Sequence, residues 1–193
     1  MTFTPITLAG NHIRLEPLAE HHKSGLCRAI EDGNLWQLFV TSVPHPNDID
    51  TFFENAHATV TSGEGLVFAT IDQASNKVIG STRFMRSNLA NKRSEIGFTF
   101  LAQSAQRTKA NSEAKLLMLT HCFETLGFNR VEFLTDFLNQ TSRAAILRLG
   151  AKQEGVLRSH VCMPNGRIRD SVIFSITAPD WPGVKQNLIF KLG

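Results

Sequence analysis

The hydrophobic positions change period along the chain, and these changes divide it into strands and helices. Runs rich in Val, Ile, Phe and Thr and bounded by Gly, Asn or Ser are typical of strands, whereas apolar residues spaced three and four apart indicate helices. Strands are predicted at 12–18, 66–72, 77–85, 94–101 and 130–137, and two more, 151–163 and 166–177, flank the hairpin signal Asn165-Gly166. Helices are predicted at 19–32, 48–62, 111–126 and 141–149, with a short helix in the tail after Pro179.

Residues that commonly begin and end helices lie at the predicted boundaries. Asn111 or Ser112 is expected to cap the helix that runs to residue 126, and Gly127 to end it. Asn139 is expected to cap the helix at 141–149, which Gly150 closes. These assignments separate the strand-rich middle of the chain from the helices that follow it.

The order of the elements is strand, helix, helix, three strands, helix, strand, helix and two strands. This order predicts a mixed α/β fold, with about seven strands in one sheet and helices on its faces, and not a doubly wound parallel sheet. No repeat, low-complexity tract or linker divides the sequence. The 193 residues are enough for one full hydrophobic core, so we expect a single domain over 1–193.

The composition, 42% hydrophobic and 19% charged, is typical of a soluble globular protein. The net charge of +3 is too small to indicate nucleic-acid binding, and the basic residues are not interleaved with aromatic ones as stacking surfaces require. The stretch 140–170 is locally basic, which favours either an anionic ligand or an ordinary solvated face. Its charged residues are Arg143, Arg148, Lys152, Arg158, Arg167 and Arg169 against Glu154 and Asp170.

Neither a membrane segment nor a metal site is expected. No stretch approaches the ~20 apolar residues of a membrane span, and the N-terminus MTFTPITLAG lacks the features of a secretory signal, so a cytoplasmic location is predicted. Cys27, Cys122 and Cys162 are far apart and odd in number, which favours neither a disulfide framework nor a zinc site. His21 and His22 are adjacent and should point to different helical faces, a poor arrangement for a metal.

The stretch AQRTKAN, residues 105–111, connects a predicted strand to the start of a predicted helix. The first N–H groups of a helix lack partners within the helix and can bind a phosphate. Gln106, Arg107 and Lys109 would add hydrogen-bond donors and charge. The stretch is therefore either an anion-binding turn or an ordinary polar connection.

Four further residues have both a functional and a structural interpretation. Asn139 is either the cap of the next helix or a ligand-binding amide, and Ser142 lies in the first turn of that helix. Glu95 could act as a base if its pKa is raised in a cleft, or it is a strand-edge acid paired with Arg93 or Lys92. His160 is either a structural histidine or a base that titrates near neutral pH.

Taken together, these segments resemble the GNAT superfamily of acyl-CoA-dependent N-acyltransferases, and within it the branch of the ribosomal-protein N-terminal acetyltransferases RimJ and RimL. The resemblance covers nearly the whole chain. It rests on four stretches: NHIRLEPLAEHH, SEIGFTFLAQSAQRTKANSEAKLLMLTHCFETLGFNRVEF, TDFLNQTSRAAILRLGAKQEGVLRSH and NGRIRDSVIFSI.

The resemblance implies a GNAT fold with splayed fourth and fifth strands and acetyl-CoA as the acyl donor, without a metal. In the family, the loop after the fourth strand holds the coenzyme pyrophosphate through N–H groups, in a Gln/Arg-x-x-Gly-x-Gly/Ala pattern. Gln106 takes the first place, Lys109 stands where the first glycine belongs, and Asn111 stands at the second small position. The cofactor-binding residues implied are Phe100, Leu101, Gln106, Arg107, Thr108, Lys109, Ala110, Asn111, Asn139 and Ser142.

Lys109 is the main departure from the family pattern. Glycine allows positive φ and close approach of the backbone to a phosphate, and lysine does not favour positive φ. Either the loop keeps its shape with the Lys109 side chain directed outward, or the affinity for the coenzyme is lower. A contact between Lys109 and a phosphate could offset part of the loss.

The resemblance also implies direct transfer of the acetyl group to an amine. Ser142 matches the serine proposed to protonate the leaving thiolate, and the chain has no tyrosine for that role. Glu95 or His160 would accept the ammonium proton. Trp36 and its loop, with the 151–177 hairpin, would shape the acceptor site.

The acceptor implied is a protein N-terminus or a small-molecule amine, and the chain would be a monomer or a homodimer. The alternative function is a non-catalytic module that binds acyl-CoA. The replaced glycine at position 109 is the one feature that favours it.

Overall fold

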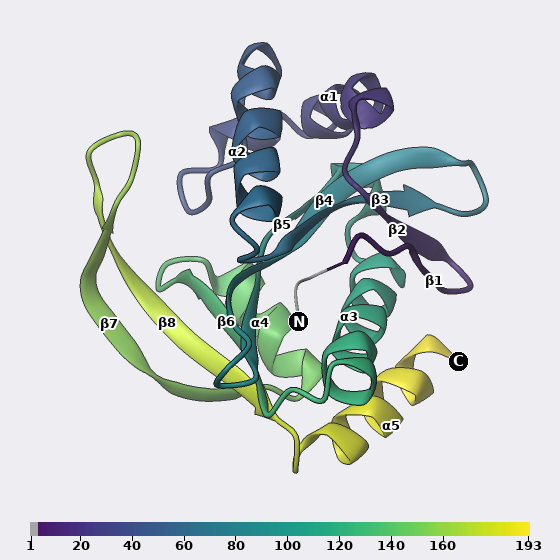
Figure 1. Cartoon of the computed structure of the whole chain (residues 1–193). Coiled ribbons are helices and arrows are strands. Elements are labelled where there is room, and N and C mark those ends of the chain that lie inside the picture. Colours follow the sequence, from purple (N-terminus) through teal and green to yellow (C-terminus); the bar gives the residue numbers. More distant parts are fainter. Residues whose placement is uncertain (1–3) are drawn as a thin grey trace.

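The protein is described by a computed structural model that covers residues 4–193. One mixed sheet of eight strands runs through it in the order β1-β2-β3-β4-β5-β6-β8-β7 (Figure 1). The strands are β1 Leu8–Ala9, β2 Ile13–Pro17, β3 Leu66–Asp72, β4 Lys77–Asn88, β5 Arg93–Leu101, β6 Arg130–Asp136, β7 Lys152–Cys162 and β8 Ile168–Thr177. The predicted mixed sheet is confirmed, and β1, at two residues too short to leave a pattern, is added to the seven strands expected.

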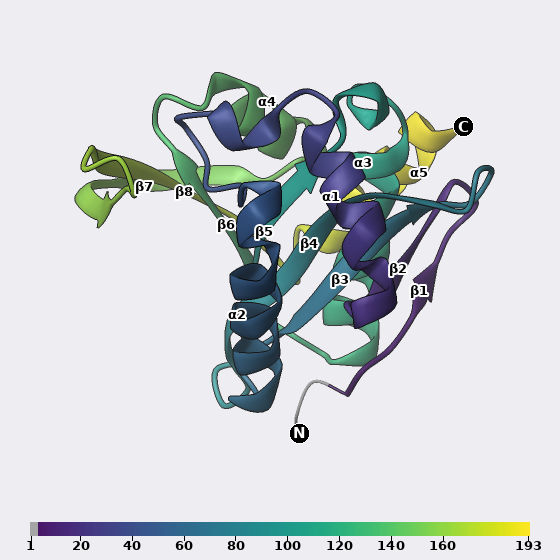
Figure 2. The same cartoon turned by 90° about the horizontal axis from the view of Figure 1, so that it is seen from above.

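Helices cover both faces of the sheet. They are α1 Lys23–Glu31, α2 Ile49–Thr61, α3 Ala110–Thr120, α4 Gln140–Leu149 and α5 Trp181–Leu192. The views in Figures 1 and 2 place α1 and α2 on one face and α3 and α5 on the other, while the β7–β8 hairpin projects beyond the helices. None of the helices in the described part of the chain is long and apolar enough to cross a membrane.

Each face of the sheet has its own hydrophobic core. The core beneath α3 and α5 contains Phe84, Ile96 and Met118, together with the fully buried Cys122. The smaller core beneath α1 and α2 contains residues such as Phe52 and Phe100.

The start of α3 differs from the prediction. The helix begins at Ala110 with Lys109 at the N-cap, so the expected cap at Asn111 or Ser112 is wrong. The Thr108 hydroxyl oxygen accepts a hydrogen bond from the Ala110 N–H at 3.2 Å and so provides a side-chain acceptor one turn earlier. The helix continues through a π-helical turn, His121–Thr125, and Gly127 follows it with a φ of 62°, as expected for a helix stop.

A buried carboxylate fixes the N-terminal end of α3 against the sheet. Glu113 accepts hydrogen bonds from the backbone N–H groups of Asn11, His12 and Ile13 at 2.8, 2.7 and 2.7 Å. A side chain at Gly10 would overlap this carboxylate, because a Cβ there would lie 2.4 Å from Glu113 Cδ. The contact holds the β1–β2 turn and the first turn of α3 together.

Strands β5 and β6 form the single parallel pair in the described sheet, and their pairing is short. The register contains three residue pairs, Arg93↔Arg130, Ser94↔Val131 and Glu95↔Glu132. Beyond Glu95 the two strands diverge, although β5 continues to Leu101 and β6 to Asp136. The splayed pair implied by the resemblance is therefore present.

Candidate active site

The divergence of β5 and β6 leaves the second half of β5 without a partner on one side. Residues 96–101 have no register partner in β6, whereas Ile96, Gly97, Phe100 and Leu101 pair with β4. The register of β4 with β5 also shifts between Ser81 and Arg83. Phe98 lies at this irregularity, has a φ of 46° and is 48% exposed. A free strand edge of this kind can pair with an extended ligand.

Both strands end at the same edge of the sheet, because they are parallel. The loop after β5 leads into α3, and the loop after β6 leads into α4. The N-termini of two helices therefore lie next to the divergent ends of the strands. Helix N-termini carry partial positive charge and favour anionic groups.

The loop between β5 and α3 presents unpaired N–H groups. Among residues 4–193, no hydrogen-bond acceptor is found for the backbone N–H of Arg107, Thr108, Lys109, Asn111 or Ser112. The loop is held at its other end, where the Gln103 N–H donates to the Asp32 carbonyl at 2.9 Å and the Ser104 hydroxyl donates to the Asp32 carboxylate at 2.5 Å. This arrangement suits an anion bound by backbone donors.

The structure resolves the alternatives for the shape of Lys109. Its φ of −69° and ψ of −15° are right-handed helical values, so no glycine is needed at this position. The left-handed residue of the loop is Arg107, with a φ of 61°. The Lys109 side chain is directed outward and donates a hydrogen bond to the Leu192 carbonyl at the end of α5.

The side chains of Gln106, Phe100 and Leu101 are occupied within the fold. Gln106 Nε2 donates to the Leu101 carbonyl at 3.0 Å. Phe100 is buried in the core beneath α1 and α2, and Leu101 is buried in the core beneath α3. These residues can therefore meet a ligand mainly through their backbone.

Asn139 and Ser142 lie together at the N-terminus of α4. Asn139 Oδ1 accepts a hydrogen bond from the Ser142 N–H at 2.9 Å, which confirms the predicted helix cap. Within the described residues the Ser142 hydroxyl has no hydrogen-bond partner, and the residue is half-buried. The hydroxyl is free to donate a proton to a bound group, and the Asn139 amide nitrogen is free to donate a hydrogen bond.

Glu95 is buried at the last paired position before the strands diverge. Burial raises the pKa of this carboxyl above its usual value, and the attraction of Arg86 opposes that rise. Arg86 Nη1 donates to Glu95 Oε2 at 3.0 Å. The expected pairing with Arg93 or Lys92 is wrong, because Arg93 contacts Glu132 on β6, at 3.2 Å.

His160 is exposed on β7. Its Nδ1 lies 3.0 Å from the Ser171 hydroxyl, which also accepts a hydrogen bond from Arg169 Nε at 2.9 Å. The positive charge of Arg169 in turn lowers the pKa of Glu95 slightly against the effect of burial. His160, Ser171 and Arg169 therefore form a polar group on the β7–β8 hairpin.

The loop around Trp36 contacts the hairpin through a different aromatic residue. Trp36 is half-buried, packs against the core beneath α1 and α2 and meets the His45 ring edge-on, with centroids 5.0 Å apart. Phe39 is 59% exposed, and its ring centroid lies 5.7 Å from the Arg167 guanidinium. Arg167 Nη2 also donates to the Phe39 carbonyl at 3.1 Å and forms an ion pair with the buried Asp136.

The sequence alone did not identify Phe39, Asp136 or Arg167 as residues near the site. An exposed Leu-Phe pair in a polar loop was the one available signal for Phe39. The ion pair joins Asp136, at the end of β6, to Arg167, just before β8, and these residues are 31 positions apart in sequence. Such a contact depends on the order of strands in the sheet.

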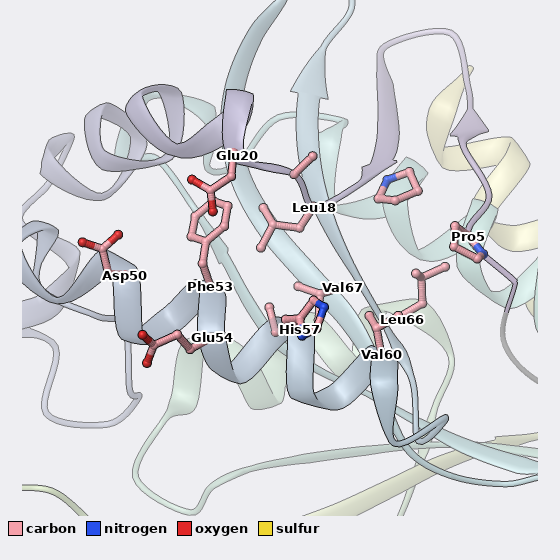
Figure 3. Close-up of a pocket in the computed structure, with 13 residues that line it drawn as sticks. Pro5, Leu18, Glu20, Asp50, Phe53, Glu54, His57, Val60, Leu66 and Val67 are labelled. Carbon is pink, nitrogen blue, oxygen red and sulfur yellow. The ribbon is translucent and has the colours of Figure 1, made fainter.

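Of two cavities at the surface of the described part of the chain, one reaches candidate site residues. One, of about 660 Å³, lies between α2 and strands β2 and β3, and Figure 3 shows Leu18, Phe53 and Leu66 lining it. It contains none of the predicted site residues. Another, of about 690 Å³, reaches the start of α3 at Thr108, Lys109 and Ala110.

The structure brings Glu16, His21 and His22 together, so the expectation that the two histidines diverge is wrong. Their ring centroids are 3.9 Å apart. The nitrogens of His22 are both engaged, Nδ1 with the Ala19 N–H and Nε2 with Glu16 Oε2, each at 3.1 Å. Hydrogen bonding at the turn before α1 therefore accounts for this group.

The sequence from residue 12 to residue 152 matches the family described as the acetyltransferase (GNAT) domain. The chain belongs to the GNAT acetyltransferase family. The match begins just before β2 and ends at the first residue of β7, so it includes the divergent strands, the loop with free N–H groups and the start of α4.

Known GNAT proteins resemble the chain in both sequence and structure. The chain is 32% identical over 95 residues to YdaF of Bacillus subtilis (strain 168), which carries the name of a ribosomal N-acetyltransferase; the match covers 49% of this chain and 51% of YdaF. The chain thus spans about half the length of this curated relative. A GCN5-related N-acetyltransferase from Brucella melitensis is 31% identical, with a TM-score of 0.88 over 100% of this chain and 88% of that one.

The fold is also shared with more distant GNAT structures. RimJ from Mycobacterium smegmatis, solved in complex with CoA-disulfide, is 19% identical and has a TM-score of 0.83 over 97% of this chain and 95% of RimJ. At this identity the likeness shows the fold alone.

Proposed function

We propose that the chain is an acetyl-CoA-dependent N-acetyltransferase that transfers the acetyl group directly to a primary amine while both substrates are bound. The observation that carries this proposal is the free edge of β5, which leads directly into a loop of unpaired N–H groups at the start of α3. A long ligand with an extended amide-containing arm and a phosphate group would satisfy both features. Membership of the GNAT family supports coenzyme A as that ligand.

The residues at this site suit three parts of coenzyme A: the pantetheine arm, the pyrophosphate and the thiol end. The backbone of Phe100 and Leu101 would bind the pantetheine arm, because their side chains are buried in the two cores. The N–H groups between residues 107 and 112 would bind the pyrophosphate. The Asn139 amide nitrogen and the Ser142 hydroxyl would bind near the thiol.

Bound acetyl-CoA supplies an activated acyl group, whose carbon–sulfur bond breaks as the carbon–nitrogen bond forms. Glu95 accepts the proton that the amine must lose, and its buried setting favours a base of higher pKa than an ordinary glutamate. The Ser142 hydroxyl would pass its proton to the leaving thiolate and regain the second proton that the nitrogen loses as the amide forms. His160, at the surface, can pass a proton to solvent.

The acceptor in this proposal is a protein N-terminus or a small-molecule amine. YdaF, by its name, is a relative directed at the ribosome, which supports a protein acceptor. The non-catalytic alternative rested on the lysine at position 109. Because Lys109 adopts ordinary helical dihedrals and its side chain is directed away from the loop, that support is lost.

The proposal is tested by measuring thiol release from acetyl-CoA with a panel of amino acids, polyamines and N-terminal peptides, together with calorimetric binding of coenzyme A. We expect micromolar-range coenzyme binding and acceptor-dependent thiol release. Tight binding without turnover of any acceptor would favour the non-catalytic module. Absence of coenzyme binding would overturn both functions.

A further inference from the structure

Arg83 is a buried cation without an anionic partner. It lies on β4 opposite Gly97 of β5 and is 5% exposed. Its guanidinium carbon lies 4.4 Å from the centroid of the Phe98 ring and 5.2 Å from that of Phe52 on α2. No ion pair or hydrogen bond of Arg83 is found among residues 4–193, and its Nε atom is fully buried without a partner.

This environment is costly for an arginine. Taking a charged group out of water is strongly unfavourable unless it is paired and hydrogen-bonded. Contacts with the faces of two aromatic rings offset only part of this cost, because a ring offers the guanidinium neither a full charge nor a conventional hydrogen-bond acceptor. Burial also lowers the pKa of Arg83 to about 10, which leaves the group charged at neutral pH. A guanidinium group commonly binds a planar acceptor through two parallel hydrogen bonds. Arg83 therefore lacks its usual kind of partner.

Arg83 lies beside the place where the acceptor amine is expected. Side chains alternate along a strand, so Glu95 and Gly97 face the same side of the sheet. A Cβ at Gly97 would lie 3.2 Å from Glu95 Oε1 and 2.8 Å from Met85 Sδ, so the glutamate extends over this glycine. Arg83, opposite Gly97 and packed against α2, lies on that same side. The proposed base and the unpaired cation thus flank one glycine.

The side chain that covers the guanidinium is itself partly exposed to solvent. Phe98, which covers one side of the guanidinium, is half exposed at the irregular part of β5. The absence of a side chain at Gly97 leaves backbone between Arg83 and Glu95. A carboxylate is planar, matches the guanidinium fork and would supply the missing charge and hydrogen-bond acceptors.

We propose that Arg83 binds a carboxylate of the acceptor, so that the acceptor carries an amine and a carboxylate only a few bonds apart. This inference rests on the proposed acetyl transfer. A free amino acid provides this chemistry, and so does a peptide whose N-terminal residue is Asp or Glu. In either case Glu95 faces the amine and Arg83 faces the carboxylate.

The test compares matched acceptors that differ in one charge. Aspartate and glutamate are assayed against asparagine, glutamine and the corresponding α-amides, and peptides beginning with Asp or Glu against peptides beginning with Asn or Gln. We expect kcat/KM to be at least tenfold higher for the carboxylate member of one set. Preference within the amino-acid set identifies a small-molecule acceptor, and preference within the peptide set identifies an acidic N-terminus. No carboxylate preference in either set would overturn the inference.

The variant Arg83→Met keeps an apolar stem between Phe52 and Phe98 and removes the charge. We expect it to lose the carboxylate preference, while its coenzyme affinity and its turnover of uncharged amines stay within about threefold of the original. The control Arg148→Gln removes an exposed arginine on α4 and should keep the preference. Retention of the preference in a folded Arg83→Met protein would contradict the inference.

Failure of the proposed acetyl transfer gives a different pattern. If no acceptor is turned over, calorimetry with N-acetylaspartate and N-acetylglutamate decides the role of Arg83 by itself. Binding that the original protein shows and Arg83→Met lacks supports the carboxylate site, and equal binding or no binding overturns it. The acid-against-amide comparison in the original protein needs no variant, so it remains decisive if Arg83→Met does not fold.

Discussion

Lys109 donates a hydrogen bond from its Nζ to the backbone carbonyl of Leu192 in the last turn of α5. The residue is thus part of the loop with free N–H groups, while its charge lies at the end of another helix. Helix C-termini carry partial negative charge and favour a cation. Lys109 therefore stabilises the contact between α3 and α5 and leaves the N–H groups of the loop uncovered.

The variant Lys109→Gly should bind coenzyme A as tightly as the original protein, within about threefold, because the loop already has the dihedrals that it needs. Its stability should fall by ~0.3–1 kcal/mol, the usual contribution of a cation at a helix end. Calorimetric titration and urea unfolding measure the two effects. A tenfold or larger loss of affinity would show that Lys109 contacts a phosphate when the coenzyme is bound.

The variant Ser142→Ala should reduce kcat by roughly 100-fold, a typical loss for a proton-transfer group, with little change in coenzyme affinity. The cap of α4 should survive, because the Asn139 side chain accepts from the Ser142 backbone N–H and not from its hydroxyl. Thr141→Ala, in the same turn and exposed, is the matched control. An unchanged kcat in Ser142→Ala would remove this residue as the acid.

The acidic limb of the pH profile should report Glu95. The base acts when it is deprotonated, so kcat/KM should rise with pH through the Glu95 pKa, which burial holds above its ordinary value of 4.5. Arg86 lowers that pKa, so Arg86→Gln should move the limb to higher pH. Glu95→Gln should remove the limb and lower the rate by about 100-fold. If the rise of kcat/KM moved to lower pH in Arg86→Gln, the assignment of Glu95 as the base would be contradicted.

Lys115 should make stability depend on pH in the alkaline range. It is 4% exposed, donates to the hydroxyls of Thr99 and Thr82 at 2.7 and 3.0 Å, and burial lowers its pKa from 10.5 to about 7. Between these pH values the unfolded lysine keeps a proton that the folded one has lost. The unfolded state then binds more protons, so stability rises with pH, by up to ~1.4 kcal/mol per pH unit.

The variant Lys115→Met removes this titration. Urea unfolding between pH 6 and about 10 should show a smaller rise in stability than in the original protein, with the largest gain for the variant at the acidic end. If the stability of the two proteins changed with pH in parallel, Lys115 would keep its proton in the folded state.

Local patterns predicted most elements, including the start and end of α4. The cap at Asn139 and the stop at Gly150 depend only on nearby residues, and both are present as expected. The cap of α3 was misplaced, because the Thr108 hydroxyl competes with Asn111 and Ser112 over a distance of one turn. The path of the loop decides which of these neighbouring polar residues caps the helix. The pattern of hydrophobic and polar positions does not specify that path.

Contacts across the sheet could not be predicted in the same way. The partner of Glu95 is Arg86, whose place depends on a register shift between β4 and β5. Asp170 accepts a hydrogen bond from the Ser159 N–H on β7, and the neighbouring Arg169 faces the opposite side of β8, because side chains alternate along a strand. The burial of Arg83 likewise requires α2 to cover the sheet, a tertiary contact.

The most direct test of the central claim is amide hydrogen exchange with and without coenzyme A. The account predicts slower exchange at residues 96–101 on the free edge of β5 and at residues 107–112 in the loop, with small changes in β1, β2 and α2. If calorimetry shows binding but coenzyme A slows exchange only outside these two stretches, the result would contradict the account.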